Sequence, residues 1–542
     1  MLDSVAFRHV RALDRQALAP EDFRQRAHGH AADADQVDPL AGHQVITDGM
    51  GIVHHGERSS FQNAFCRIDG KKALHNLQKH FIILHEYVKC NGKGGEKVAN
   101  IPKSVQEVLE ILTAAGHEAW CVGGCVRDTL LGRTPEDWDV TTSALPEETM
   151  ALFGQRALPT GLRHGTVTVR TDRGGVEVTT FRCDGAYHDH RRPDTVTFTR
   201  SLEEDLKRRD FTVNAMALGL DGTIRDPFGG QEDLMAGILR CVGEPDRRFD
   251  EDALRILRAL RFSAVLGFSI EEKTAAGIHK NKELLGDIAA ERIQAELFKL
   301  LCGKNALAVM RAYPDVIGVF WPEVLPMVGL DQRNHHHCYD VWEHTIHAVA
   351  AVPPEPEVRC AALLHDIGKP ATFTVDENGV GHFYGHAAAS EELADGMLRR
   401  LKCSRSFRET VVRLVAWHDR NIPRTDKAVR RALGKLGERD LRRLIALKRA
   451  DNLAQSPAYF SRQRELDKGE AILDKLLAED ACFSLKQLAV NGKDLTKIGL
   501  SGPAVGRMLN ALLDRVVDGD VPNEREALLK TAAELLPLFA ES

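Results

Sequence analysis

Two acidic side chains one residue apart offer the most direct chemistry in this chain. Asp137 and Asp139 flank Trp138 in a segment with the character of a β-strand, and alternate side chains of a strand point to the same face. Paired carboxylates suit Mg²⁺, which prefers oxygen ligands and is usually shared with substrate phosphates. Two such ions can clamp the attacking and leaving oxygens of an in-line displacement. Alone, the spacing is more typical of two solvated acids.

A glycine pair upstream has the arrangement of a phosphate cradle. Gly123 and Gly124 stand between an expected strand and an expected helix, where missing side chains let backbone N–H groups approach a triphosphate. Arg127 follows in the first turn of that helix and can grip a phosphate bidentately. A plain turn is the alternative for the glycines. Glu177, on a later strand, is either a third carboxylate or one partner of a cross-strand salt bridge.

A second set of potential ligands lies between residues 335 and 452. Imidazoles and carboxylates on separate helices can converge on a divalent ion inside a helical bundle. Any one of these histidines is by itself more typical of a surface or capping residue. The set consists of His344, His365, Asp366, His386, His418 and Asp451. The adjacent residues 335–337 are interpreted as a connector, because three neighbouring histidines cannot all face one ion.

Hydrophobic periodicity divides the chain into an α/β head and a long helical body. The helical pattern runs from Asp250 to almost the end of the chain, with short Gly and Pro breaks. The head, by contrast, mixes helices with strands that have antiparallel features. Its predicted elements are helix 104–115, strand 117–122, helix 126–131, strand 138–142, a hairpin of 166–170 with 176–181, and segments 211–220 and 223–225 around a turn.

Composition excludes several classes of protein. The 542 residues carry 72 Lys+Arg, 78 Asp+Glu and a net charge of −6, which is ordinary for a globular chain of several domains and excludes collagen, coiled coil and wholesale disorder. Apolar runs such as 81–84 fall far short of the ~18–20 residues of a membrane span, so no membrane partner is expected. Eleven scattered cysteines and the lack of a signal-peptide pattern favour reduced thiols and a cytoplasmic location.

Five motifs occur in a characteristic order. They are Gly-Gly-Cys-Val-Arg-Asp-Thr-Leu-Leu-Gly-Arg (123–133), Asp-Trp-Asp-Val-Thr-Thr (137–142), Arg-Arg-Asp-Phe-Thr-Val-Asn-Ala-Met-Ala (208–217), Asp-Pro-Phe-Gly-Gly (226–230) and Glu-Asp-Ala-Leu-Arg-Ile-Leu-Arg-Ala-Leu-Arg-Phe (251–262). Together they resemble class II CCA-adding tRNA nucleotidyltransferases and bacterial poly(A) polymerases, from about Val98 to the C-terminus. The resemblance implies an α/β nucleotidyltransferase head of polymerase-β type, followed by a long all-α neck, body and tail.

The resemblance also implies roles for single residues of the head. Asp137 and Asp139 would be catalytic and would hold Mg²⁺. The incoming nucleotide would be held by Gly123, Gly124, Arg127 and Arg209.

In the neck, Asp252 and Arg255 match the pair that reads the base. Because they are i and i+3, we expect them to be neighbours on one helix face, where an acceptor beside a donor can pair with the edge of cytosine or adenine. Arg258 and Arg261 lie along the same expected helix. They would bind the nucleotide, phosphates or the RNA end, with structural salt bridges as the alternative.

The ordered set H…HD…H…H…D resembles the HD phosphohydrolase superfamily in its binuclear-metal version. It implies a transition-metal ion or a second Mg²⁺ site and hydrolysis of phosphomonoesters or 2′,3′-cyclic phosphates. The expected division is an extension (1–97), the head (98–228), a neck and body for base reading and RNA binding (229–330), an HD domain (331–455) and a tRNA-binding tail (456–542).

The expected activity is template-independent addition of C, C and A to the 3′ end of tRNA from CTP and ATP with Mg²⁺. Partial CC or A addition, poly(A) synthesis, and an HD phosphohydrolase with an inactive head are the alternatives. The loop that would discriminate partial from full addition is expected between residues 142 and 164, and its length alone does not decode it. The oligomeric state stays open.

Residues 1–97 sustain neither a helical nor a strand period. Just before Val98 stands Gly-Lys-Gly-Gly-Glu-Lys (92–97), whose codons can all be written in purines. Such a tract is what a ribosome-binding site before a GTG start would give if translated. We therefore expect much of 1–97 to be upstream sequence read through by gene calling, with a genuine, loosely ordered extension as the alternative.

Overall fold

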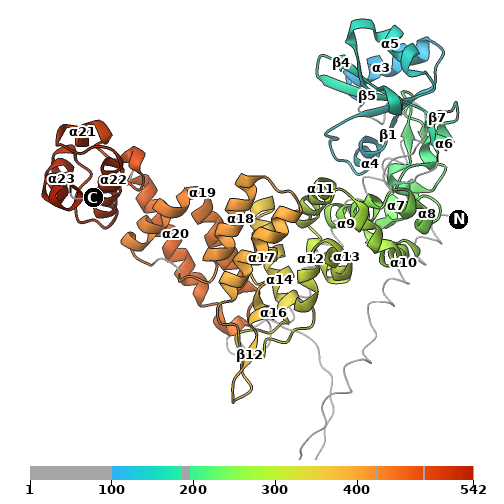
Figure 1. The fold of residues 1–542 in the computed structure, drawn as a ribbon. Coiled ribbons are helices and arrows are strands. Elements are labelled where there is room, and N and C mark those ends of the chain that lie inside the picture. The colour runs from blue at the N-terminus through green and yellow to red at the C-terminus, as the bar shows by residue number, and fades with distance from the viewer. Residues whose placement is uncertain (1–100, 186–195, 422–423, 480–481, 541–542) are drawn as a thin grey trace, which may run out of the picture. The chain divides into compact units, whose positions relative to one another are not determined.

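The computed structural model describes residues 101–185, 196–421, 424–479 and 482–540 (Figure 1). The expected extension 1–97 lies outside the described residues. Within the described ranges, no helix is long and apolar enough to cross a membrane.

A seven-stranded mixed sheet forms the head. The strand order is β3-β4-β5-β2-β1-β8-β9, and every neighbouring pair is antiparallel except β2 with β5. This single parallel pair places the first residue of β2, Asp139, opposite Glu177 of β5. The strands are β1 (Ala119–Val122), β2 (Asp139–Thr142), β3 (Ala157–Gly161), β4 (Thr166–Thr171), β5 (Gly174–Thr180), β8 (Ala217–Leu218) and β9 (Ile224–Arg225).

Helices pack on this sheet as the periodicity predicts. α5 (Pro146–Phe153) packs on β4 and β5, and α3 (Lys103–Ala114) packs on β1 and lies beside α5 (Figure 1). The predicted helix 104–115 and the hairpin of β4 with β5 are both confirmed. Alternate valines of the hairpin enter the core while the residues between them face outward, the period-2 signature of a strand buried on one face. The head also contains α4 (Gly124–Leu130) and α6 (Leu202–Lys207).

The prediction for 211–220 is only partly right. Its last part forms β8, but Thr212–Asn214 makes the short 3-10 helix η3. The side chain of Asp210 accepts hydrogen bonds from the backbone N–H of Phe211 (2.9 Å) and from Asn214 Nδ2 (3.1 Å). These local bonds compete with strand pairing and fold the chain into a turn.

The body is helical, as predicted. Its first helices are α7 (Gly230–Ala236), α8 (Pro245–Glu251), α9 (Leu254–Leu266), α10 (Glu272–Asn281), α11 (Ala290–Leu301), α12 (Ala306–Ala312) and α13 (Pro314–Phe320). They are followed by α14 (Val341–Ala351), α15 (Pro356–Leu364), α16 (Lys369–Thr372), α17 (His386–Arg400), α18 (Arg405–Trp417), α19 (Asp426–Leu453) and α20 (Arg462–Ala478). A non-helical residue, Gly437 (φ 73°), divides α19 into two helices across a kink.

The last helices are α21 (Gly492–Lys497), α22 (Pro503–Val517) and α23 (Arg525–Ala540), which enclose a hydrophobic cluster of their own. The remaining short strands pair as β6 (Arg182–Asp184) with β7 (Val196–Phe198), β10 (Ile238–Leu239) with β11 (Ser269–Ile270), and β12 (Thr374–Val375) with β13 (Gly381–His382). The other 3-10 helices are η1 (Gly154–Arg156), η2 (Leu162–His164), η4 (Lys282–Asp287), η5 (Pro322–Met327), η6 (Pro457–Tyr459) and η7 (Leu485–Gln487).

Close packing between α7 and η3 leads to a testable prediction. A Cβ atom at Gly230 would overlap the carbonyl oxygen of Thr212, whereas a Cβ at Gly506 in α22 would meet nothing within 4 Å. We expect Gly230→Ala to destabilise the head by about 1–3 kcal/mol through overpacking. Gly506→Ala should instead leave stability unchanged or raise it by up to ~1 kcal/mol. Thermal unfolding of the two variants measures the difference, and equal unfolding temperatures would contradict this packing.

Candidate functional site

Three carboxylates gather where β2 and β5 begin to run side by side. Asp139 opens β2 opposite Glu177, and Asp137 lies two residues earlier. The prediction that Asp137 lies on the strand is wrong, because β2 starts only at Asp139. Burial raises the pKa of Asp139, the nearby charges of Glu177 and Asp137 raise it further, and Arg209 opposes them. Among the described residues no cation lies within ion-pair distance of Glu177, so the structure favours its role as a third carboxylate over a salt bridge.

A guanidinium group lies against the glycine turn beside these carboxylates. Gly123 has a φ of 81°, and a Cβ there would stand 3.0 Å from Arg209 Nη1 and 3.9 Å from Asp139 Oδ2. Only glycine combines this backbone conformation with so close an approach. The Nε atom of Arg209 is buried and has no hydrogen-bond partner among the described residues. The turn therefore presents a cation and open backbone next to the acids, as a triphosphate site requires.

Sequence reasoning missed the anchor of this arginine. Asp205, on α6, is fully buried, lies 3.7 Å from Arg209 Nη2 and accepts hydrogen bonds from Arg208 at 2.8 and 2.9 Å. The sequence did contain a signal for this anchor, because Asp205 precedes Arg208 and Arg209 by three and four residues, the spacing of ion pairs on a helix.

Arg127 is already held in place. It donates to both carboxylate oxygens of Asp128 (2.8 and 3.0 Å) and to Asn214 Oδ1 (2.7 Å), and its guanidinium lies 5.2 Å from the centre of the Phe262 ring. An arginine fixed on several sides loses little conformational freedom when it binds a phosphate.

An ion pair between a buried carboxylate and a half-buried arginine connects the head to helix α9. Arg258 donates to Asp210 Oδ2 at 2.6 and 2.8 Å, and Asn214 donates to the same carboxylate. Burial would raise the pKa of Asp210, but Arg258 and Asn214 outweigh it and lower the pKa to about 2. Arg261 in turn pairs with Glu296 of α11 at 2.5 Å. Arg258 and Arg261 thus form the structural salt bridges that were the alternative to substrate contacts.

The expected geometry of Asp252 and Arg255 is wrong. Asp252 has extended backbone (φ −143°, ψ 100°) in the break between α8 and α9, so the two residues do not share a helix face. Asp252 pairs with Arg292 at 3.3 Å, whereas Arg255 pairs with Glu251 at 2.9 Å. Arg255 also donates to the backbone carbonyls of Arg248 and Arg208. Asp252 Oδ1 accepts a hydrogen bond from the N–H of Leu254, the first residue of α9 (3.2 Å), and this local bond favours the break between α8 and α9.

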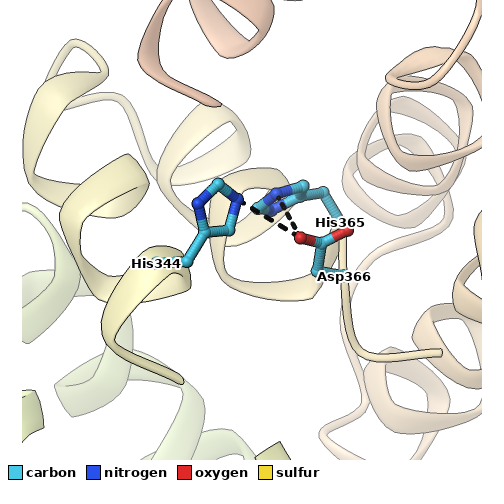
Figure 2. Close-up of side chains that lie close together, drawn as sticks. All are labelled: His344, His365 and Asp366. Atoms are coloured by element: carbon cyan, nitrogen blue, oxygen red, sulfur yellow. Dashed lines mark ion pairs between the residues drawn. The ribbon is translucent and has the colours of Figure 1, made fainter. Parts of the chain in front are cut away.

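The second set of predicted ligands does converge. We call His344, His365, Asp366, His386, His418 and Asp451 the His/Asp cluster. Figure 2 shows the rings of His344 and His365 turned toward the carboxylate of Asp366, at 3.3 and 3.2 Å. The ligand atoms form two groups that share Asp366, one with His344 and His365 and the other with His386 and His418, and all atoms of each group lie within 4.8 Å of one another.

Each of the four imidazoles is oriented by a backbone carbonyl. The Nδ1 atoms of His344, His365, His386 and His418 lie 3.1, 2.8, 2.9 and 2.6 Å from the carbonyl oxygens of Ala454, Ala362, Phe383 and Val415. This contact sets Nδ1 as the donor, so in the neutral ring Nε2 carries the lone pair and is directed into the cluster. Second-shell orientation of this kind is typical of metal-ligating histidines.

Charge in the cluster is balanced internally. Asp451 Oδ1 lies 3.1 Å from His344 Nε2, and Lys369 Nζ lies 2.7 Å from Asp366. Burial lowers the pKa of His344, but its contacts with Asp366 and Asp451 outweigh this and raise the pKa to about 9. The charges of the His344 imidazolium and of Lys369 therefore offset those of the two carboxylates. A divalent cation could take over that task.

Three family models match parts of this chain. The Poly A polymerase head domain matches residues 119–240, the probable RNA and SrmB-binding site of polymerase A matches 267–313, and tRNA nucleotidyltransferase domain 2 (putative) matches 377–532. The first of these contains the carboxylates and the glycine turn.

Similarity to complete relatives decides the family. A CCA-adding enzyme of Limosilactobacillus fermentum is 36% identical over 447 residues, which span 81% of this chain and 99% of the relative. Another, from Latilactobacillus sakei subsp. sakei, is 38% identical over 435 residues, or 78% of this chain and 96% of the relative. This chain belongs to the CCA-adding enzyme family.

A solved CCA-adding enzyme shares the same fold over almost its whole length. The crystal structure of the Bacillus stearothermophilus CCA-adding enzyme, a complex with CTP, is 33% identical and superposes with a TM-score of 0.62 over 81% of this chain and 98% of that one. The expected polymerase-β-type head followed by a helical body is thereby confirmed for this member of the CCA-adding family.

The ion pair between head and α9 leads to a prediction about pH. Because the pKa of Asp210 is lowered in the folded state, the pair contributes stability above pH ~4, and the contribution is lost as the pH falls toward 2. We expect Arg258→Met to lower stability at pH 7 by about 1–3 kcal/mol, a value discounted for the partial exposure of Arg258. The deficit should shrink as the pH is lowered from 4 to 2.5.

Thermal unfolding across this pH range measures the effect. Arg247→Met is the matched control, because Arg247 is 75% exposed in its contact with Glu251 and such surface pairs contribute less than about 1 kcal/mol. A deficit in Arg258→Met that stays constant from pH 7 to 2.5 would contradict the role given to Asp210.

Proposed function

We propose that this chain adds C, C and A to the 3′ end of tRNA without a template, using CTP and ATP. The observation that carries the proposal is the carboxylate group Asp137, Asp139 and Glu177 beside the Gly123–Arg209 turn, in a chain that belongs to the CCA-adding enzyme family. The similarity extends over 96–99% of the length of relatives that are named CCA-adding enzymes. This favours addition of C, C and A over addition of CC or A alone and over poly(A) synthesis.

The three carboxylates fit Mg²⁺, because they supply only oxygen donors and Glu177 has no cation partner among the described residues. Mg²⁺ bound there would neutralise charge that develops on the transferred phosphoryl group. The backbone of Gly123 and Gly124 leaves room for the triphosphate, and Arg127 and Arg209 would bind its oxygens bidentately. The same arrangement would hold the α-phosphate in line with the tRNA 3′-hydroxyl.

Base reading is assigned to Asp252 and Arg255. Asp252 offers an acceptor for the exocyclic amine of cytosine or adenine, the group that distinguishes these bases from uracil. Arg255 would exchange its hydrogen bonds to the carbonyls of Arg208 and Arg248 for the base edge. The pairs of Arg258 with Asp210 and of Arg261 with Glu296 would keep α9 in position while this exchange takes place.

The other parts of the chain receive roles by the same proposal. Residues 98–228 are the catalytic head, 229–330 the neck and body, 331–455 an HD domain and 456–542 a tRNA-binding tail. Exposed arginines of α17 to α19 would contact tRNA phosphates. A cytoplasmic location, expected from the cysteine content, belongs to this proposal.

The catalytic assignment is tested by Asp137→Asn. Loss of one carboxylate from the group should reduce nucleotide addition at least ~100-fold, since charge stabilisation of the transition state is commonly worth that much per group. The assay uses tRNA that lacks CCA, with CTP and ATP supplied singly and together. Asp172→Asn, an exposed position in the β4–β5 turn, is the control. Long A tracts made by the parent enzyme without use of CTP would overturn the proposal.

We also propose a second activity in the His/Asp cluster, namely metal-dependent hydrolysis of phosphomonoesters or 2′,3′-cyclic phosphates. The observation that favours it is the orientation of all four imidazoles by backbone carbonyls, with their Nε2 atoms directed at shared carboxylates. Nitrogen and oxygen donors together suit a transition-metal ion better than Mg²⁺. Metal held there would lower the pKa of a bound water and supply a nucleophile.

Metal analysis tests this second site independently of the first. We expect full-length protein equilibrated with Mn²⁺ and then desalted to retain metal, and His386→Gln to reduce the content while nucleotide addition continues. His382→Gln is the control, because His382 pairs with Asp376 outside the cluster. If the parent protein retains no metal and hydrolyses neither class of ester, the second activity is ruled out.

A further inference from the structure

The segment between η5 and α14 forms one wall of the His/Asp cluster. It is fixed to the surrounding elements at three points. Ser456 N–H donates to the carbonyl of His336 (2.8 Å), Gly381 N–H donates to the carbonyl of Arg333 (2.9 Å), and Lys369 Nζ donates to Gln332 Oε1 (2.8 Å). Lys369 itself pairs with Asp366. The segment is therefore held rigidly beside the cluster.

One histidine of this segment faces the cluster. The ring of His337 lies 5.0 Å from that of His344, at an interplanar angle of 88°. Lys369, His344, Asp366 and Asp451 all lie close enough for their charges to act on the pKa of His337. By contrast, His335 is exposed, and His336 packs its ring 4.3 Å from Tyr459. The connector interpretation thus describes His335 and His336 but misses the inward side chain of His337.

His337 has a polar atom that the described structure leaves without a partner. Its Nδ1 is buried and makes no hydrogen bond with any described residue. Buried polar atoms are almost always hydrogen-bonded, so an open one beside a reactive cluster indicates a partner that arrives with a ligand. The nitrogen belongs to neither ligand group of the cluster, so His337 lies beside the metal positions and is not one of them.

We propose that His337 donates a hydrogen bond from Nδ1 to a phosphoryl oxygen of the substrate bound at the His/Asp cluster. The inference rests on the second activity proposed above and assigns it a further substrate-binding residue. A phosphate bound at the cluster would have oxygens that are not taken up by a metal ion, and these oxygens need hydrogen-bond donors. Lys369 already donates to Gln332 and Asp366, whereas His337 Nδ1 is uncommitted. A neutral imidazole can supply the donor without competing for metal.

The test separates hydrogen bonding from packing. His337→Phe keeps a ring against His344 but removes both nitrogens, and His337→Asn keeps a polar amide near the position of Nδ1. His335→Phe, in the exposed neighbour, is the matched control. All are made in full-length protein that also carries Asp137→Asn and Asp139→Asn, so that the head does not bind Mn²⁺ and any phosphate binding at Arg127 and Arg209 is the same in every variant. We measure the Mn²⁺ content of each variant. Calorimetry on the Mn²⁺-loaded protein then gives the Kd of inorganic phosphate.

We expect His337→Phe to weaken phosphate binding about tenfold or more, the usual effect of losing a hydrogen bond to a charged group. Binding by His337→Asn should stay within about threefold of the parent, and Mn²⁺ content should be the same in all variants. Unchanged phosphate affinity in His337→Phe, or loss of Mn²⁺ from this variant, would overturn the inference about His337 and leave the proposed second activity standing. A parent protein that retains no Mn²⁺ would overturn the second activity and this inference together.

Discussion

The ion pair between Asp210 and Arg258 is the interaction on which the proposed nucleotide site depends. Arg127 of α4 donates to Asn214, and Asn214 donates to the buried carboxylate of Asp210. The same carboxylate accepts from Arg258 of α9. A buried acid is costly to leave without its cationic partner. Asp210 therefore helps to connect the proposed triphosphate half of the site to the helix beside the proposed base-reading half, together with the hydrogen bond of Arg255 to the carbonyl of Arg208.

The His/Asp cluster follows a different principle. Each of its four imidazoles is oriented by its own backbone carbonyl, so the directions of the rings are set in part by the backbone of the helices that carry them. The helices α14, α15, α17, α18 and α19 pack together around it and bring residues more than 100 positions apart, such as His344 and Asp451, into contact.

Much of this arrangement was predictable because it depends on short-range chemistry. The helix α3, the β4–β5 hairpin and the helical body follow from hydrophobic periodicity. Two of the wrong predictions have a shared cause, since each involves a side chain that bonds to nearby backbone. Asp210 accepts from the N–H of Phe211 just before the 3-10 helix 212–214, and Asp252 accepts from the N–H of Leu254 at the break between α8 and α9. Competition of this kind between side chain and backbone is invisible to periodicity.

The sequence by itself determined which residues carry chemistry: the paired aspartates, the glycine turn, the arginines and the ordered histidines. Residue type and spacing are local properties, and the charge of a side chain and the backbone freedom of glycine follow directly from residue type. Only the tertiary structure decided which of these groups meet. It placed Glu177 beside Asp139 through one parallel strand pair. It also paired Arg258 with Asp210 and placed the ring of His337 against that of His344. Such contacts depend on strand order and helix packing over long separations, which no single stretch of sequence specifies.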